Sequence, residues 1–445
     1  MEMNKLISNF LVIIFFTFCL SMNASGDDGS QTQKKLTPEL SLKNLLIQVI
    51  NNHEEIKSFK SQVEQAKELY LKSKGLYYPT LDLVADGGRE KIDKEYYTDT
   101  NENRYNITLR ANQLITDFGK TQDIIARSGV SLEQAKARLE SSRQQLMFEG
   151  IKAYINVVRA RERLKSARLS EARIKELTGI EETLVEKKAG LSSDVLQVKS
   201  QLAGAMALRV EAQGELNFAK NRFQAVFYHN LSDKEIAYIK DIEFPHKQLP
   251  LKLENAVAIA LKKNPELLIT MYNTQLAQKD IDIAKKAFYP RFNLFAEAVS
   301  KENDAGEDGY RNELSGGVEL RYNLFSGGRD RAELKSALAS KNAASYHTGY
   351  VQKIIKEQVS NTWEQLSVLK QRAELLKQQA DIVENFLLLA KKERKMGTRS
   401  LLDVLNGEIN YINSIATSIA ATQDTKIAAY NLFFAMGNIN LQLFE

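Results

Sequence analysis

Four short segments of the chain alternate strictly between apolar and polar residues. In the first, Leu81, Leu83 and Ala85 point to one side of an extended chain, and Thr80 and Asp82 point to the other. A period of two with one apolar and one polar face predicts a strand whose two sides meet different surroundings. The apolar sets of the other three segments are Tyr105, Ile107, Leu109 and Ala111, then Phe292, Leu294, Ala296 and Ala298, then Leu314, Val318, Leu320 and Tyr322.

The four segments form two predicted β-hairpins, at about 77–116 and 288–325, around polar loops at 87–103 and 301–310. Such strands suit a soluble sheet with its apolar face on a helix, or a membrane barrel with that face in lipid. Tyrosine and phenylalanine near the strand ends favour the membrane barrel. Closed membrane barrels need about eight strands, so several copies of the chain would share one barrel. A dimer would supply eight strands and a trimer twelve, which leaves a channel.

Two long stretches without proline, 118–187 and 329–395, predict helices on the order of 100 Å long at 1.5 Å per residue. Leu132, Leu139 and Leu146 recur every seven residues, which is typical of helices that pack side by side. Shorter helices, each about half as long, are predicted beside them at 41–74, 193–227, 253–287 and 400–435.

This order of elements occurs twice, so the chain is predicted to be an internal duplication. Tyr77-Tyr78-Pro79-Thr80-Leu81 matches Phe288-Tyr289-Pro290-Arg291-Phe292, and Ala189-Gly190-Leu191 is paired with Met396-Gly397-Thr398. The predicted organisation is a first repeat at 41–228 with a tip turn at 188–194, an inter-repeat linker at 229–250, a second repeat at 251–438 with a tip turn at 396–403, and a C-terminal tail at 439–445.

The N-terminus has the pattern of a secretory signal peptide, expected at 1–26 and followed by a linker at 27–40. Lys5 precedes an apolar stretch, Phe10 to Leu20, that is too short for a comfortable membrane span. Cys19, the sole cysteine of the chain, lies in that stretch, so the mature protein is expected to have no cysteine-based metal site. A net charge of +5, without a basic patch rich in aromatics, disfavours nucleic-acid binding.

The four histidines of the chain are scattered and form no catalytic or metal-binding motif: His53, His229, His246 and His347. Trp363 lies in a predicted helix and is interpreted as a packing residue. The sequence therefore predicts no enzyme, no cofactor and no metal site.

Taken together, the signal peptide, the duplicated unit and three pairs of motifs resemble the TolC family of outer-membrane efflux and secretion channels. The motifs that carry the resemblance are the Tyr-Pro strand starts, Asp117-Phe118-Gly119 with Ser326-Gly327-Gly328-Arg329, and Gly397-Thr398-Arg399-Ser400-Leu401-Leu402-Asp403. The resemblance implies a mostly α-helical chain with a small transmembrane β part. It further implies a homotrimer with a twelve-stranded β-barrel continued by an α-helical barrel, in the outer membrane of a Gram-negative bacterium.

The resemblance also implies roles for residues at the periplasmic tip. Asp403 matches an acid that narrows the tunnel, while Asn406 stands where the family often has a second acid. Arg399 and Thr398 match the segment that ties the tip closed, with Ser193 and Asp194 as candidate partners in the first repeat; Arg394 stands where some members have a tyrosine tie. From residue type, Gly190 and Gly397 are predicted to end helices with positive φ, and Pro79 and Pro290 to open strands.

Three functions stay open at this point. The first is the exit duct of a type I protein secretion system, with a periplasmic adaptor and an inner-membrane ABC exporter as partners. The second is the outer-membrane factor of a proton-driven pump for small molecules or metals. A periplasmic coiled-coil adaptor or scaffold is the alternative of another class.

Overall fold

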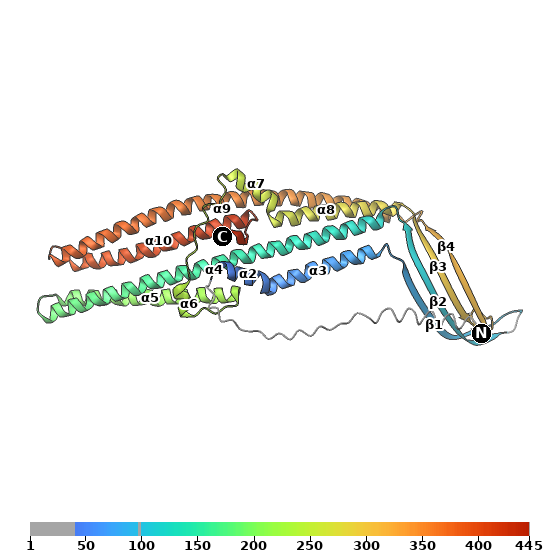
Figure 1. The fold of residues 1–445 in the computed structure, drawn as a ribbon, viewed down its shortest axis with the longest axis horizontal. Coiled ribbons are helices and arrows are strands. Elements are labelled where there is room, and N and C mark those ends of the chain that lie inside the picture. The colour runs from blue at the N-terminus through green and yellow to red at the C-terminus, as the bar shows by residue number, and fades with distance from the viewer. Residues whose placement is uncertain (1–40, 97–98, 445) are drawn as a thin grey trace. The chain divides into compact units, whose positions relative to one another are not determined.

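A computed structural model describes residues 41–96 and 99–444 (Figure 1). The first repeat contains α2 (Leu42–Asn52), α3 (Glu54–Gly75), β1 (Thr80–Ile92), β2 (Thr100–Thr116), α4 (Lys120–Glu186) and α5 (Ser192–Phe227), and the short α6 (Asp233–Tyr238) follows it. The second repeat contains α7 (Leu253–Lys263), α8 (Pro265–Lys285), η1 (Lys286–Phe288), β3 (Arg291–Glu302), β4 (Tyr310–Arg321), α9 (Arg329–Lys395) and α10 (Leu401–Ala435), before the final turn η2 (Leu441–Phe444). The predicted signal peptide and the linker at 27–40 lie outside the described residues.

The four strands form one antiparallel sheet in the order β1-β2-β3-β4. Leu83 lies opposite Leu109, which lies opposite Ala298, which in turn lies opposite Leu314. The predicted apolar faces therefore join into one surface, and Leu83 and Leu314 on it are 68% and 86% exposed. The predicted division of each strand into an apolar and a polar face is confirmed.

The polar face of the same sheet carries charged side chains that pair across strands. The guanidinium of Arg110 lies 3.7 Å from the carboxylate of Glu297 and 3.9 Å from that of Glu319. All three side chains remain partly exposed. One face of the sheet thus suits an apolar medium and the other suits water.

The first hairpin is longer than the sequence predicted. β1 continues to Ile92 and β2 begins at Thr100, so most of the expected loop at 87–103 is paired strand. That expectation was wrong because a polar composition does not end a strand where both faces meet water. The second hairpin agrees closely with expectation, since β3 ends at Glu302 and β4 begins at Tyr310.

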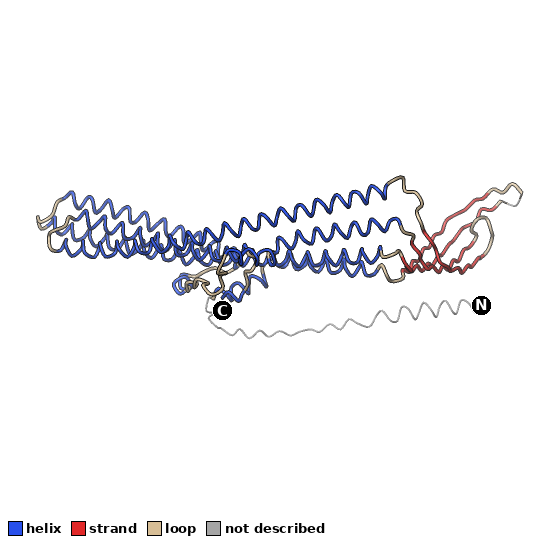
Figure 2. The backbone as a smooth tube through the Cα atoms, turned by 90° about the horizontal axis from the view of Figure 1, so that it is seen from above, coloured by secondary structure: helices blue, strands red, loops and turns tan. Residues whose placement is uncertain are grey.

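The two longest helices, α4 and α9, each contain 67 residues and match their predicted ranges. In each repeat the long helix contacts both of its half-length neighbours, α3 and α5 along α4, and α8 and α10 along α9. The four strands gather at one end of the helices and the helix–helix turns at the other (Figure 2). The helical core is centred where the half-length helices meet the long ones, around Ile151, Phe223 and Phe433.

Each helix predicted ahead of a hairpin is in fact two helices. The expected helix at 41–74 breaks at His53, and the one at 253–287 breaks at Asn264. Asn264 adopts an extended conformation, and its side chain accepts hydrogen bonds from the amides of Glu266 and Leu267. Pro265, at the first helical position, favours this start and is the signal that the prediction overlooked. At His53, the ring accepts a hydrogen bond from the amide of Glu55.

Candidate functional site: the tip of the helical hairpins

The turn between α9 and α10 ends the long helix with a left-handed residue. Gly397 has φ 78°. Its amide and that of Thr398 donate to the carbonyls of Arg394 and Glu393, at 3.0 and 3.1 Å. This is the Schellman arrangement, in which a residue with positive φ reverses the chain and satisfies terminal carbonyls. The structure therefore gives Gly397 the conformation predicted for it.

The turn between α4 and α5 has the same hydrogen bonds with different residues. The amides of Lys188 and Ala189 donate to the carbonyls of Val185 and Leu184, at 2.9 and 2.8 Å. The residue with positive φ is Lys188, at 59°, and the prediction that Gly190 fills this role was wrong.

Gly190 lies close to the end of the preceding helix. A Cβ atom there would lie 3.0 Å from the Cβ of Leu184, so a side chain would require its neighbours to shift by a few tenths of an ångström. α9 begins 209 residues after α4, at Arg329 and Lys120, and α10 begins 209 residues after α5, at Leu401 and Ser192. The two turns therefore have equal length, and the position of Gly190 corresponds to that of Arg399.

The start of α10 is capped, whereas the start of α5 is not. The side chain of Ser400 accepts a hydrogen bond from the amide of Asp403 at 3.2 Å, and Leu191 has no such side chain. Asp403 lies in the first turn of its helix, where a carboxylate is favoured by the helix dipole. Asp403 and Asn406 are both exposed.

Arg399 is held by residues of its own repeat. Its guanidinium lies 2.9 Å from the carboxylate of Glu393 and 3.6 Å from that of Asp403, over the ring of Phe386 at 5.1 Å. The Thr398 hydroxyl donates to the Glu393 carbonyl at 3.0 Å.

The expected partners of Arg399 lie on the other turn, where Ser193 is exposed and Asp194 is half-buried. Among the described residues of the single chain, the ion pairs of Arg399 do not include them.

Arg394 makes an ion pair between the two repeats. Its guanidinium donates to the carboxylate of Glu181 on α4 at 3.1 Å, and only 3% of the Glu181 surface is exposed. The second amino group of Arg394 lies 3.4 Å from the carbonyl oxygen of Arg399. An arginine thus makes an inter-repeat contact at the position where some family members are expected to have a tyrosine tie.

A buried ion cluster joins three helices farther from the tip. Glu408 of α10 has no exposed surface and lies 2.8 Å from Arg173 of α4 and 2.7 Å from Lys391 of α9. Although partial burial pulls the other way, the hydrogen bond and charge of Glu408 raise the pKa of Arg173. Nearby, burial and then a hydrogen bond to Glu384 raise the pKa of the Tyr411 hydroxyl.

Sequence reasoning missed this cluster, although a signal was present. Glu408 falls on the apolar stripe of α10, between Leu405 and Tyr411, at helical spacing. A carboxylate in such a stripe needs a buried cationic partner, because burying an unpaired charge is costly.

Pro79 and Pro290 lie one residue before β1 and β3, at the start of each hairpin. No group of three or more His, Cys, Asp or Glu side chains that could hold a metal ion occurs in residues 41–96 and 99–444. Within the same residues, every helix is too short or too polar to cross a membrane.

A family model described as "Outer membrane efflux protein" matches residues 45–226 and again 256–438. The chain belongs to the outer membrane efflux protein family. The two matches coincide with the two structural repeats, and the resemblance to the TolC family is confirmed. The protein is therefore an outer-membrane efflux channel of the kind that works in tripartite systems, and it is not an enzyme.

Curated relatives and solved structures agree with this assignment. The outer membrane efflux protein BepC of Brucella suis is 24% identical, over 89% of this chain and 85% of its own length. The alkaline protease secretion protein AprF of Pseudomonas aeruginosa is 23% identical, over 76% and 70%. The outer membrane protein VceC of Vibrio cholerae has the same fold, with a TM-score of 0.74 and 19% identity over 89% of this chain and 96% of its own.

Proposed function

We propose that the protein is the trimeric exit duct of a type I protein secretion system. Three copies would contribute twelve strands to one barrel in the outer membrane and their helices to a tunnel in the periplasm. A periplasmic adaptor and an inner-membrane ABC exporter would dock at the helical tip. The duct itself would be passive, and the exporter would supply the energy.

The faces and edges of the sheet support the membrane part of this proposal. Its apolar face is exposed in the single chain, and its opposite face bears the Arg110, Glu297 and Glu319 charges. β1 and β4 each have one unpaired edge, and lipid does not tolerate unpaired strand edges. Pairing of β4 with β1 of the next copy would remove every edge when the ring closes.

The protein cargo is supported by the similarity to AprF, whose name assigns it to protease secretion. Deletion of the gene tests the cargo. We expect one or more large proteins to disappear from the culture medium, with unchanged susceptibility to drugs and metal ions. The opposite result would be an unchanged set of proteins in the medium together with increased susceptibility to drugs or metal ions. It would favour the proton-driven efflux pump, the alternative supported by the similarity to the efflux protein BepC.

Asp403 and Asn406 are proposed to line the narrowest part of the closed tunnel. Three symmetry-related copies would place three carboxylates and three amides around one axis, which favours cations. Because the guanidinium of Arg399 lies 3.6 Å from the Asp403 carboxylate within the chain, part of the negative charge of the ring would be offset at rest.

Arg399 is proposed to hold the tip closed. Arg399→Ser removes its ion pairs with Glu393 and Asp403, so we expect higher single-channel conductance in planar bilayers. Lys187→Ser, at an exposed cation of the other turn, is the control and should leave conductance unchanged. If both variants conduct like the parent protein, Arg399 is not part of the closure.

A further inference from the structure

The segment between β3 and β4, residues 303–309, is not confined to its own hairpin. The sheet has the order β1-β2-β3-β4, so a loop that only joined β3 to β4 would not contact β1. The amide of Gly306 nevertheless donates a hydrogen bond to the carboxylate of Glu90 on β1, at 3.1 Å. The segment therefore touches a strand that is not its neighbour, and we call residues 303–309 the strap.

The strap is docked on the first hairpin around Gly306. The ammonium group of Lys94 donates a hydrogen bond to the carbonyl of Gly306 at 2.5 Å. Gly306 is buried although it lies in the middle of a loop. A Cβ atom added there would lie 2.9 Å from the Lys94 side chain and 3.1 Å from the hydroxyl oxygen of Thr100, which is itself buried. The strap is thus packed against the hairpin rather than surrounded by solvent.

One acid of the strap is held between two cations. The carboxylate of Asp304 lies 3.4 Å from the guanidinium of Arg104 on β2 and 3.2 Å from the ammonium of Lys301 on β3. The side chain of Asp304 is only 14% exposed, whereas that of Glu307 is 72% exposed and Asp308 is also exposed. The strap therefore turns one acid toward the sheet and leaves the other two in the open.

The docking residues of the sheet lie on its polar face. Asp82 on β1 lies opposite Arg110 on β2, and both belong to that face. Successive residues of a strand point to opposite sides, so Glu90 shares the face of Asp82, and Arg104 shares the face of Arg110. Arg104 also forms an ion pair with Asp86, another residue of this face. The strap is therefore held from the polar side of the sheet.

The first hairpin extends beyond β3 at the place where the strap docks. Glu302, the last residue of β3, pairs with Tyr105, so residues 100–104 of β2 continue past the end of β3. This is the part of the chain that the sequence analysis expected to be a loop. The polar residues of the extension are explained by the contacts that they make with the strap.

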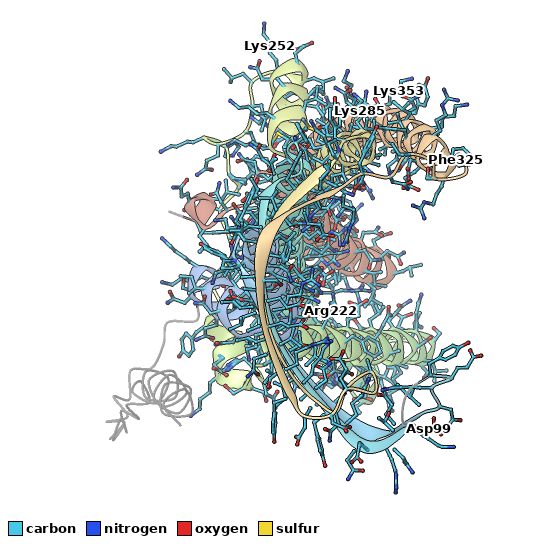
Figure 3. All side chains as sticks on the ribbon, turned by 90° about the vertical axis from the view of Figure 1, so that its right-hand side faces the viewer. Asp99, Arg222, Lys252, Lys285, Phe325 and Lys353 are labelled. Atoms are coloured by element: carbon cyan, nitrogen blue, oxygen red, sulfur yellow. The ribbon has the colours of Figure 1, made fainter. Side chains whose placement is uncertain are left out.

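The strap lies at the end of the sheet that is far from the helices (Figure 2). Figure 3 views the molecule from the side of the strands and shows Asp99, in the turn of the first hairpin, far across the sheet from Phe325, just after β4. In the proposed duct the helices lie in the periplasm, so the turns between paired strands lie at the outer mouth. The polar face of the sheet would line the water-filled bore there.

We propose that the strap folds inward over the bore and sets the size of the solutes that can enter the duct from outside. This inference rests on the proposed trimer, in which three straps would share one mouth, and it names the element that limits the outer width. Glu90, Lys94 and Arg104 hold the strap in place. Partly exposed ion pairs are weak, so cargo that arrives from the tunnel can displace it.

Exclusion of polymers in planar bilayers measures the width of each mouth separately. Polyethylene glycols of graded size, added to one chamber, change the conductance only if they enter the channel from that side. Gly306→Val should raise the size limit on the strap side, because the new side chain collides with Lys94 and Thr100 and undocks the strap. The size limit on the opposite side, at the helical tip, should stay the same. Glu307→Cys with a membrane-impermeant thiol reagent identifies the chamber that faces the strap.

Gly309→Val is the matched control for this variant. Gly309 also has positive φ, at 97°, but a Cβ atom added there would meet nothing within 4 Å. The control therefore adds the same backbone strain to the same loop without the collision. It should retain the size limit of the parent protein.

A second matched pair changes charge instead of shape. Asp304→Asn removes the ion pairs with Arg104 and Lys301 and should raise the same size limit. Asp308→Asn removes an equal charge from an exposed residue of the strap and should leave the limit unchanged. The difference between the two variants separates docking of the strap from the charge of the mouth.

Three outcomes would overturn the inference. If all four variants keep the size limit of the parent protein, the strap does not narrow the mouth, although the proposed duct stands. If each control widens the mouth as much as its partner, docking at Gly306 and Asp304 does not set the width. A parent protein that forms no channel at all would contradict the proposed function and the inference with it. Heat-modifiable trimers verify the assembly of each variant, and if Gly306→Val does not assemble, the Asp304 and Asp308 pair decides.

Discussion

The two repeats share a backbone but use different residues at its most demanding positions. In the first repeat Phe118, Lys188 and Tyr228 adopt positive φ, at 55°, 59° and 52°. In the second repeat the residues 209 positions later are all glycine, with φ between 65° and 78°: Gly327, Gly397 and Gly437. Packing and hydrogen bonds therefore impose the left-handed conformation, and glycine only makes it easier to adopt.

The bulky residues of the first repeat make contacts that glycine cannot make. The ring of Phe118 stacks on that of Tyr289, with centroids 5.6 Å apart, and the ring of Tyr228 lies 5.3 Å from that of His53. A hydrogen bond from Tyr228 also lowers the pKa of Glu54. These contacts offset the strain of a side chain at positive φ.

The largest difference in stability between corresponding variants of the two repeats is expected at Gly437. A Cβ there would lie 2.4 Å from the Cα of Asn264, and φ is 67°. Gly437→Ala should cost about 3 kcal/mol or more, as the sum of left-handed strain and overpacking. Guanidinium unfolding in detergent, followed by circular dichroism, measures it. Tyr228→Ala places alanine at the counterpart position by removing a side chain that is 58% exposed, and it should cost less; an equal cost would contradict the crowding argument.

The next effect concerns the buried ion cluster. Glu408→Ala leaves Arg173 and Lys391 without their carboxylate and should cost roughly 3 kcal/mol, the low end for a broken buried pair, because both cations are about one-third exposed. Lys199→Ala, at the counterpart position, removes an exposed ion pair and should cost about 1 kcal/mol or less. The unfolding midpoints of the two variants measure these losses of stability. Similar losses would contradict the difference between the buried and the exposed ion pair.

A smaller effect is expected at Gly397. Its φ is 78°, but an added Cβ would meet nothing within 4 Å, so Gly397→Ala suffers strain alone. We expect a loss of about 1–2 kcal/mol in unfolding free energy. A loss as large as that of Gly437→Ala would show that the turn is more crowded than the structure indicates.

The smallest expected effect is a gain in stability. Lys188→Gly relieves a left-handed lysine and should stabilise the protein by about 1 kcal/mol. Lys187→Gly is the control, because Lys187 has φ −81° and gains nothing from glycine. Destabilisation by Lys188→Gly would mean that the lysine side chain, and not its backbone, matters in this turn.

Patterns with a strict period predicted most of the fold. The alternation around Leu83 and Leu314 gave the correct strand faces, and the proline-free stretches gave α4 and α9 almost to the residue. The helix break at His53 has no glycine or proline to announce it, and the His53 ring caps the following helix by accepting a hydrogen bond from the amide of Glu55.

At the tip, matching residue types between the repeats predicted the turn less well than the constant offset of 209 residues between corresponding helices. Pairing Gly190 with Gly397 shifted the first turn by two residues, because a glycine is used there for close packing rather than for positive φ. Arg399, Asp403 and Gly397 could be found from their motif. The Arg394–Glu181 tie could not, and for the Glu408 cluster the sequence shows the carboxylate in an apolar stripe but not its partner Arg173, since each contact joins residues more than 200 positions apart.

Reconstitution of the purified protein into a planar bilayer tests the central claim most directly, namely that three copies turn the apolar face of their sheets to lipid and enclose a water-filled channel. We predict discrete, long-lived, uniform conductance steps from trimeric protein. A monomer that stays out of the bilayer and never conducts would contradict the account.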